Sequence, residues 1–194
     1  MQMMQQFNTN KVVIYNTIQL YRHDRLPFLQ DSYEASVRNN FLLGMKPVRG
    51  AYMEKERKRA GDLGYPSPIQ PDKEHTDKDY NACLEFCMRH IDRISLIVAS
   101  HNEFSNLYAT QLMQRYGINA DSDHVWFSQL YGMSDNITFN LAKAGFNATK
   151  YLPFGPIKDV ISYLMRRAQE NTSVSGQTGR ELALIKKEIR RRAI

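Results

Sequence analysis

The chain has 194 residues, enough for one domain with a proper core or for part of a larger one. Its apolar content of 42% and charged content of 24% are typical of a soluble globular protein, and no apolar run reaches membrane-spanning length. The net charge is +6, but aromatic residues are not interleaved with the basic segment Lys186–Arg192, which argues against nucleic-acid binding.

Short β-rich runs alternate along the chain with longer amphipathic segments. We expect strands at residues 11–17, 44–50, 95–100, 124–130 and 148–152. We expect helices at residues 29–42, 53–63, 77–93, 103–116, 136–144, 157–170 and 180–192. This strand–helix alternation indicates an α/β protein with a parallel sheet.

The near-continuous apolar run SLIVAS (residues 95–100) is typical of a parallel strand buried on both faces. A doubly wound sheet and a (β/α)8 barrel both fit, but no GxGxxG or Walker sequence follows the first expected strand. Polar residues instead cluster just after the strands, as at the catalytic rim of a barrel. Five strands cannot close an eight-stranded barrel. We therefore predict a single unit over residues 1–194, the C-terminal portion of a (β/α)8 TIM-type barrel whose first strands are absent or supplied by another chain.

The segment Lys150–Asn171 predicts a helix with a charged face. Tyr163, Arg166, Arg167 and Glu170 share one side at helical spacing, beside an apolar stripe. Two adjacent guanidiniums suit a carboxylate or phosphate ligand. The alternative is a solvated surface pair with little energetic consequence.

The expected rim residues together suggest an amphipathic, anionic small molecule beside a flat cofactor. Lys46 and Arg49 are suited to stabilise the reduced, anionic ring of a flavin. His101 and the neighbouring Asn102 offer hydrogen bonds to a ring or a pyrophosphate. Aromatic walls with polar tips are offered by Tyr52, Tyr151 and Tyr163. Taken singly, each of these residues is more often an ordinary side chain whose hydrogen bonds are made within the protein.

The two cysteines, Cys83 and Cys87, lie one helical turn apart, and His90 extends the same face. A zinc site would need a further ligand or an open position, so we interpret the pair as buried packing and predict no metal. A disulfide between two thiols of one helix would also add little stability, which is consistent with a reducing compartment.

Five motifs occur in order along the chain: VRGAYMEKER, ASHNE, QLYGM, KYLPFG and YLMRRAQEN. In this order they closely resemble the flavin-dependent proline dehydrogenases, from about Val12 to Asn171, and the last motif is the most specific. The resemblance implies a (β/α)8 barrel with FAD at its C-terminal rim. It implies oxidation of L-proline to 1-pyrroline-5-carboxylate, with hydride transfer from the carbon next to nitrogen to flavin N5. It also implies a quinone acceptor at a membrane.

Carried over by position, the resemblance assigns roles within this sequence. Arg166 and Arg167 would bind the substrate carboxylate, with Glu170 keeping them oriented, and together with Lys46 they form the expected catalytic set. The residues implied to line the proline ring are Ala51, Tyr52, Leu130, Tyr151 and Tyr163. The residues implied to contact FAD are Asn16, Lys46, Arg49, Gly50, Ala51, Ser100 and His101.

Three departures from the family pattern stand out. Lys46 occurs where many bacterial members carry arginine, which keeps the charge but loses the fork. Pro47 lies inside an expected central strand although it lacks an N–H group. The family's early-strand lysine and aspartate have no counterpart in residues 1–194. We therefore expect the polypeptide by itself to have little or no activity.

Other functions stay open on the sequence alone. One is a 4-hydroxyproline dehydrogenase, although an aromatic wall at Tyr151 offers no pocket for an added hydroxyl. Another is a non-catalytic truncated barrel that serves as a binding or assembly domain, and a third is a barrel enzyme with a phosphate ligand at the paired arginines. We expect a cytoplasmic location with peripheral contact to the inner membrane, or a mitochondrial one in a eukaryote. The basic helix at 180–194 is the candidate for that contact.

Overall fold

The computed structural model describes residues 1–173 and 177–192, and the side chains of residues 168–181 lie outside that description. The chain forms two compact units, Met1–Tyr151 and Leu152–Ile194. The strands are β1 (Asn16–Gln19), β2 (Leu43–Val48), β3 (Ile94–Ala99), β4 (Val125–Leu130) and β5 (Ala148–Tyr151). The helices are α1 (Gln2–Phe7), α2 (Arg25–Arg38), α3 (Met53–Leu63), α4 (Lys73–Arg89), α5 (Glu103–Arg115), α6 (Asp135–Lys143), α7 (Ile157–Ser173) and α8 (Gln177–Arg192).

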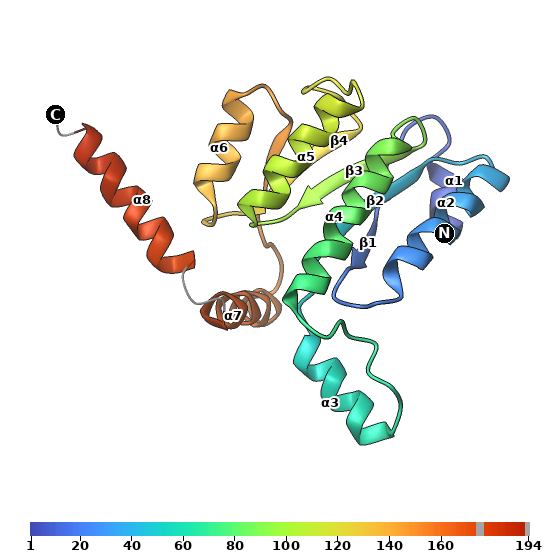
Figure 1. Cartoon of the computed structure of the whole chain (residues 1–194), viewed down its shortest axis with the longest axis horizontal. Coiled ribbons are helices and arrows are strands. Elements are labelled where there is room, and N and C mark those ends of the chain that lie inside the picture. Colours follow the sequence, from blue (N-terminus) through green and yellow to red (C-terminus); the bar gives the residue numbers. More distant parts are fainter. Residues whose placement is uncertain (174–176, 193–194) are drawn as a thin grey trace. The chain divides into compact units, whose positions relative to one another are not determined.

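The first unit is built on one five-stranded parallel sheet in the order β1-β2-β3-β4-β5 (Figure 1). Each strand is joined by a helical connection to the next strand in sequence, which lies beside it and runs parallel to it. This is the strand order of a (β/α) barrel. The predicted α/β class with five strands of a partial barrel is confirmed. All five carboxyl ends lie along one edge of the sheet.

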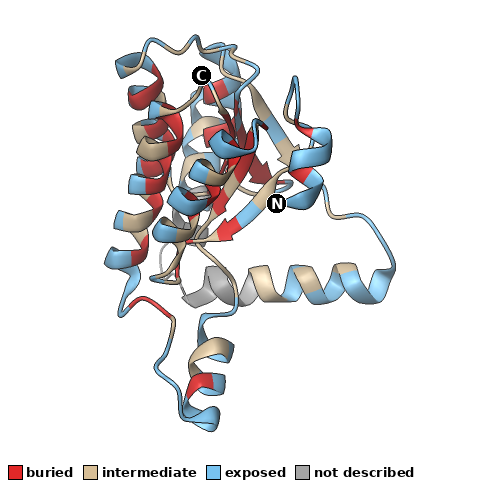
Figure 2. Cartoon of the chain, turned by 90° about the vertical axis from the view of Figure 1, so that its right-hand side faces the viewer, coloured by how far each residue is buried: buried red, intermediate tan, exposed pale blue. Residues whose placement is uncertain are grey.

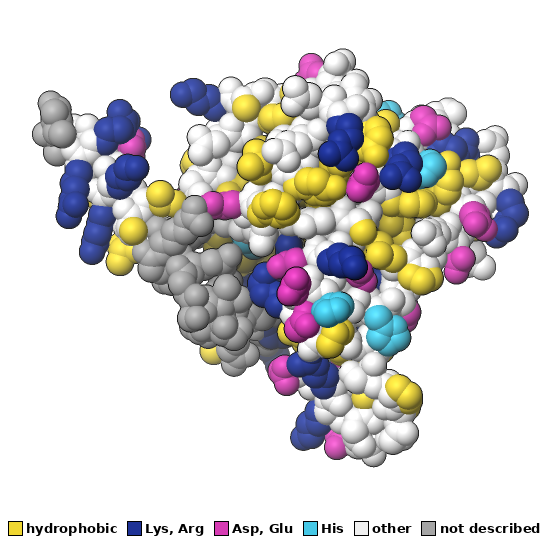
Figure 3. All heavy atoms as spheres, viewed as in Figure 1, with side chains coloured by type: hydrophobic (Ala, Val, Ile, Leu, Met, Phe, Trp, Pro, Cys, Tyr) yellow, Lys and Arg dark blue, Asp and Glu magenta, His cyan; other side chains and the backbone are white. Residues whose placement is uncertain are grey.

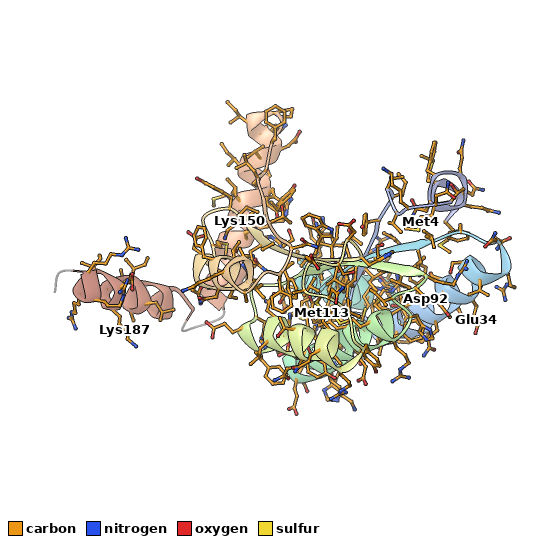
Figure 4. All side chains as sticks on the ribbon, turned by 90° about the horizontal axis from the view of Figure 1, so that it is seen from above. Met4, Glu34, Asp92, Met113, Lys150 and Lys187 are labelled. Atoms are coloured by element: carbon orange, nitrogen blue, oxygen red, sulfur yellow. The ribbon has the colours of Figure 1, made fainter. Side chains whose placement is uncertain are left out.

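The two faces of the sheet differ in burial. Along β3, Ile94, Leu96 and Val98 are completely buried, whereas Ile97 is only half-buried. Helices α2, α4, α5 and α6 supply the cover over the buried face, and Figure 2 shows buried residues gathered where helices and strands meet. Met113 of α5 lies within this dense packing (Figure 4). Helix α3, which is mostly exposed, extends away from the sheet (Figure 1).

The first strand begins later than the sequence predicts. Residues 11–15 are not in a strand, and β1 starts at Asn16. The buried Asn8 side chain binds this segment instead: its Oδ1 accepts the N–H groups of Val13 and Ile14 at 3.0 and 2.9 Å, and its Nδ2 donates to the Ile14 carbonyl at 2.8 Å. A local side chain thus replaces a neighbouring strand as the backbone's partner.

Several helix ends depart from the prediction, and a side-chain cap explains one of them. Helix α4 begins at Lys73 rather than at residue 77, because the Asp72 carboxylate accepts the His75 N–H at 2.8 Å. Helix α2 spans Arg25–Arg38 instead of residues 29–42. Helix α1 was not expected at all, and its Met4 is buried in the core.

Pro47 lies in β2, inside the sheet, as the sequence predicts, and the pairing adjusts to it. Strand β2 pairs with β1 as far as Val48, but its register with β3 ends at Met45. The Leu43 N–H donates to the Arg93 carbonyl on the β3 side. Alternate residues of a strand point their N–H groups to the same side, so an N–H group at residue 47 would also face β3, and proline has none. The missing donor therefore ends the ladder toward the rim.

The second unit consists of α7 and α8. Apolar side chains of α7 are exposed, with 77% of Ile157 and 53% of Ile161 accessible. On α8, exposed Leu182, Ile185 and Ile189 accompany a basic last turn, and Figure 3 shows the Lys and Arg side chains along this helix. Within the described ranges, no helix has both the length and the apolar character needed to cross a bilayer.

Candidate functional site

Three predicted site residues share the less buried face of the sheet. Lys46 pairs with Thr17 of β1, and Leu130 pairs with Tyr151 of β5, all at positions that alternate with the helix-covered ones. Leu130 is 7% exposed, whereas Tyr151 is 45% exposed. The alternation of the strands therefore brings these side chains to one surface.

Lys46 and Tyr151 meet although they belong to β2 and β5. The Lys46 Nζ lies 5.4 Å from the centroid of the Tyr151 ring. In a flat sheet three strand spacings would separate the two backbones by about 14 Å, so the sheet curves and this face is concave. Burial lowers the pKa of the Lys46 amino group. The concave face thus holds a half-buried cation against an aromatic ring.

Arg49 follows β2 and is fixed by acceptors from neighbouring elements. Its Nε donates to Asp77 Oδ1 at 2.5 Å, its Nη1 to Ser100 Oγ at 2.9 Å and its Nη2 to Ser105 Oγ at 2.9 Å. The next residue, Gly50, has φ +119°, and a Cβ there would meet the Tyr21 ring at 1.4 Å. Glycine is required at this position for steric reasons alone.

Ser100 and His101 follow β3 and are tied to β4 and α6. His101 Nδ1 lies 2.9 Å from Ser134 Oγ, at the start of α6, where Ser134 adopts a left-handed φ of 52°. The Ser100 carbonyl accepts a hydrogen bond from buried Gln129 Nε2 at 3.2 Å. Thr138 Oγ1 donates to Gln129 Oε1 at 2.8 Å, so this buried amide is held at both ends.

The remaining predicted residues of the first unit are less closely grouped. Ala51 and Tyr52 come after β2, half-buried and 39% exposed respectively, and Tyr52 directly precedes α3. Asn16 is the first residue of β1, and its position alternates with that of Thr17, the partner of Lys46. The structure therefore does not bring Asn16 to the concave face at the rim, and its role as a flavin contact stays a prediction.

The arginine pair belongs to α7 in the second unit. Arg166 and Arg167 are half-buried, and the Arg167 Cζ lies 5.3 Å from the centroid of the Tyr163 ring. The helix therefore does place Tyr163 and Arg167 side by side. Glu170 is in the same helix, but its side chain lies outside the described residues.

Sequence reasoning missed the side chains that surround Arg49. Asp77 and Tyr80 are both on α4, and the Arg49 Cζ lies 4.3 Å from the centroid of the Tyr80 ring. Ser105 is on α5, where its hydroxyl also donates to Asn81 at 2.9 Å. The three-residue spacing of Asp77 and Tyr80 indicates a shared helix face, but nothing in the sequence pairs that face with Arg49.

Cys83 and Cys87 are completely buried in the core, and the hydrogen bond between them and burial raise the pKa of the Cys83 thiol. The His90 ring packs against the Tyr33 and Phe86 rings, with centroids 4.3 and 4.8 Å away. In the described part of the chain, no group of three or more His, Cys, Asp and Glu side chains is placed to hold a metal ion.

Curated relatives match the chain over nearly its whole length. A proline dehydrogenase 1, mitochondrial, from Drosophila melanogaster is 42% identical over 99% of this chain and 30% of its own length. The human protein of the same name is 39% identical over 99% of this chain and 32% of its own length. A hydroxyproline dehydrogenase from Xenopus laevis is 41% identical, over 99% of this chain and 42% of its own length. The chain spans about a third of the first two.

Solved structures agree with the fold. A proline utilization A protein from Bdellovibrio bacteriovorus, inactivated by N-propargylglycine, matches with a TM-score of 0.80 and 26% identity, over 87% of this chain and 17% of its own. The D779Y mutant of the Bradyrhizobium japonicum protein gives a TM-score of 0.75 and 26% identity, over 84% of this chain and 16% of its own. The model of the proline dehydrogenase family matches residues 1–180. The chain belongs to the proline dehydrogenase family.

Proposed function

We propose that this chain carries the C-terminal part of an FAD-dependent proline dehydrogenase site. The substrate would be L-proline and the product 1-pyrroline-5-carboxylate, formed by loss of a hydride from the carbon next to nitrogen and of a proton from nitrogen. The observation that carries this proposal is the contact of Lys46 with Tyr151, 5.4 Å from Nζ to the ring centroid. The residue expected beside a flavin and the residue expected beside the proline ring lie together on the concave face.

The donor set at the rim fits a flavin dinucleotide. Lys46 and Arg49 supply two cations, while Ser100 and His101 supply hydrogen-bonding groups after β3. The Tyr80 hydroxyl, buried beside Arg49, makes no well-formed hydrogen bond in the described part of the chain. Gly50 and Ala51 would permit close approach of the cofactor to the backbone. When bound, the flavin supplies the hydride acceptor, its N5 atom.

The chain's own residues would position the substrate and balance charge. Arg166 and Arg167 would bind the carboxylate of proline through planar forks, with Glu170 orienting them. Tyr151, Tyr163 and Leu130 would line the proline ring, with Ala51 and Tyr52 beside it, which restricts its orientation and excludes water. Lys46 would offset the negative charge that develops on the cofactor. Its lowered pKa makes this contribution dependent on pH, because the charge is lost as the pH rises through that value.

A flavin titration tests this function. We expect the purified chain to quench FAD fluorescence on binding, and Lys46→Met to weaken that binding. Proline-dependent dye reduction is expected only after three further strand–helix units are restored in front of β1. A non-catalytic assembly domain, the second candidate, has no reason to bind FAD. Absence of flavin binding by the restored barrel would therefore favour it.

The choice of imino acid needs its own measurement. The relative named hydroxyproline dehydrogenase is 41% identical, so similarity alone does not select the substrate. The Tyr151 ring favours the unhydroxylated ring, because an aromatic wall leaves an added hydroxyl without a partner. We expect the restored barrel to have the higher kcat/KM for proline. A higher value for 4-hydroxyproline would reverse the assignment.

The electron acceptor and location follow the same proposal. We propose a quinone acceptor, reached through peripheral contact with an inner membrane, and a mitochondrial location in a eukaryotic cell. The exposed apolar residues and basic last turn of α8 suit an anionic membrane surface. Co-sedimentation with vesicles containing anionic lipid, compared with neutral vesicles, tests this contact.

A further inference from the structure

Arg49 is held by three acceptors on three different elements. Asp77 is on α4, Ser100 follows β3 and Ser105 is on α5, at donor–acceptor distances of 2.5, 2.9 and 2.9 Å. Each acceptor engages a different nitrogen of the guanidinium. A flexible side chain tied at all three nitrogens has one orientation rather than many.

Helix α4 contributes to Arg49 both a counter-ion, Asp77, and an aromatic ring that packs against the guanidinium. The Tyr80 ring lies under the guanidinium, 4.3 Å from Cζ to its centroid, and the residue is completely buried. Burial raises the pKa of the Tyr80 hydroxyl, which stays neutral at any physiological pH. Asp77 comes one turn before Tyr80 on the same helix face. The carboxylate that binds Arg49 and the ring that packs against it therefore come from one helix.

The ion pair does not cancel the positive character of the cluster. Asp77 also accepts a hydrogen bond from Lys73, so one carboxylate is shared between two cations. Lys73, Asp77 and Arg49 together carry one net positive charge. A guanidinium has five N–H groups, and the three bonds use three of them. The cluster thus keeps both charge and donors for an anionic ligand.

We propose that Asp77, supported by Ser105, is a positioning residue that fixes Arg49 for recognition of the anionic part of the flavin dinucleotide. This inference rests on the proposed function, in which Arg49 contacts the cofactor. Asp77 acts through Arg49 and itself makes no contact with the ligand. Because the guanidinium is ordered before the cofactor arrives, binding does not have to order it.

Flavin affinity in matched variants of the full chain tests the proposal. We expect Asp77→Ala to weaken FAD binding about tenfold, the lower end of the loss found when the orienting partner of a metal ligand is removed. Asp77→Asn keeps one acceptor oxygen and should lose less. Glu74→Ala is the control, because it removes an exposed carboxylate from the same helix without touching Arg49. Circular dichroism and the thermal midpoint show whether each variant is folded.

A double-mutant cycle separates positioning from a general effect. If Asp77 acts through Arg49, the Arg49→Met/Asp77→Ala protein should bind FAD no more weakly than Arg49→Met alone. Losses that simply add would overturn the proposal. So would wild-type affinity in Asp77→Ala. Inorganic pyrophosphate as a competing ligand shows whether the lost affinity belongs to the phosphate portion.

Hydrogen exchange of the Arg49 Nε–H group gives a readout that needs no flavin. We expect this signal, identified by its absence in Arg49→Met, to exchange slowly in the wild-type chain and fast in Asp77→Ala. A restored barrel that binds no FAD would refute the proposed function and, with it, the cofactor role of Arg49. The exchange rates would still decide whether Asp77 orders the guanidinium. Fast exchange in the wild-type chain would refute that ordering.

Discussion

The sheet unit and the helical unit treat their apolar residues differently. In β3, Leu96 and Val98 are completely buried beneath helices. In α7 and α8, Ile157 is 77% exposed and Ile189 is 61% exposed. Both regions have the apolar spacing expected of a packed element, so spacing alone does not say which elements form a core. We expect most of the free energy of unfolding to come from the sheet unit, because helices gain stability chiefly from the surface they pack against.

The largest expected effect comes from truncating a core strand. Leu96→Ala should lower the free energy of unfolding by about 3 kcal/mol, since it leaves a cavity between the sheet and its helices. Ile161→Ala is the comparison on α7, where 53% of the side chain is exposed, and should cost less than about 0.5 kcal/mol. Urea denaturation followed by circular dichroism measures both. Equal losses would contradict the contrast between the units.

A buried amide should rank second. Asn8→Ala removes the partner of two N–H groups and of two carbonyls, those of Ile14 and Leu42, and should cost about 2 kcal/mol. The exposed Asn10 gives the control, Asn10→Ala, with little expected change. The same denaturation experiment applies. A loss no greater than that of the control would mean that the segment before β1 holds its shape without Asn8.

A smaller effect should appear as a pH dependence. Hydrogen bonds from Arg22 and then Arg25 lower the pKa of Asp24 below its ordinary value of 3.8. Because the folded value is the lower one, this contribution is complete above about pH 4 and is lost as the pH falls further. With 38% of the side chain exposed, we expect less than about 1 kcal/mol. Asp24→Asn should reduce the acid sensitivity below pH 4, and an unchanged profile would argue against the pairing.

The smallest effect belongs to Glu188 on α8, whose side chain is 43% exposed. Hydrogen bonds from Arg191 and Arg192 lower its pKa to about 2. Glu188→Gln should leave the unfolding of the sheet unit unchanged, because surface pairs of this kind contribute little. A lower urea midpoint for the sheet unit would show that α8 stabilises it.

Much of the fold was predictable because the strands are short apolar runs that alternate along the sequence with amphipathic helical segments. Residues 125–130 and 148–151 were placed within one residue of the observed strands. The first strand was placed wrongly because KVVIYNT has the composition of a strand, while its backbone partner is the side chain of Asn8. A hydrogen bond between a side chain and the backbone a few residues away leaves no periodic signal in the sequence.

The candidate site was predictable only in part. The rim positions follow from strand ends, and the structure brings Lys46, Leu130 and Tyr151 to one face. Asp77 was missed because its pairing with Arg49 spans 28 positions in sequence and depends on how α4 crosses the sheet. Asn16 was assigned to the cofactor on resemblance alone, and the alternation along β1 separates its position from that of Thr17, the partner of Lys46.

Pro47 has a consequence for how β2 and β3 are held together near the rim. Its ring nitrogen carries no hydrogen, so the backbone seam between the two strands stops short at Met45. Beyond that point the strands are joined by a side chain, through Arg49 and Ser100 at 2.9 Å. At the rim, this pair of strands therefore depends on the same guanidinium that Asp77 holds.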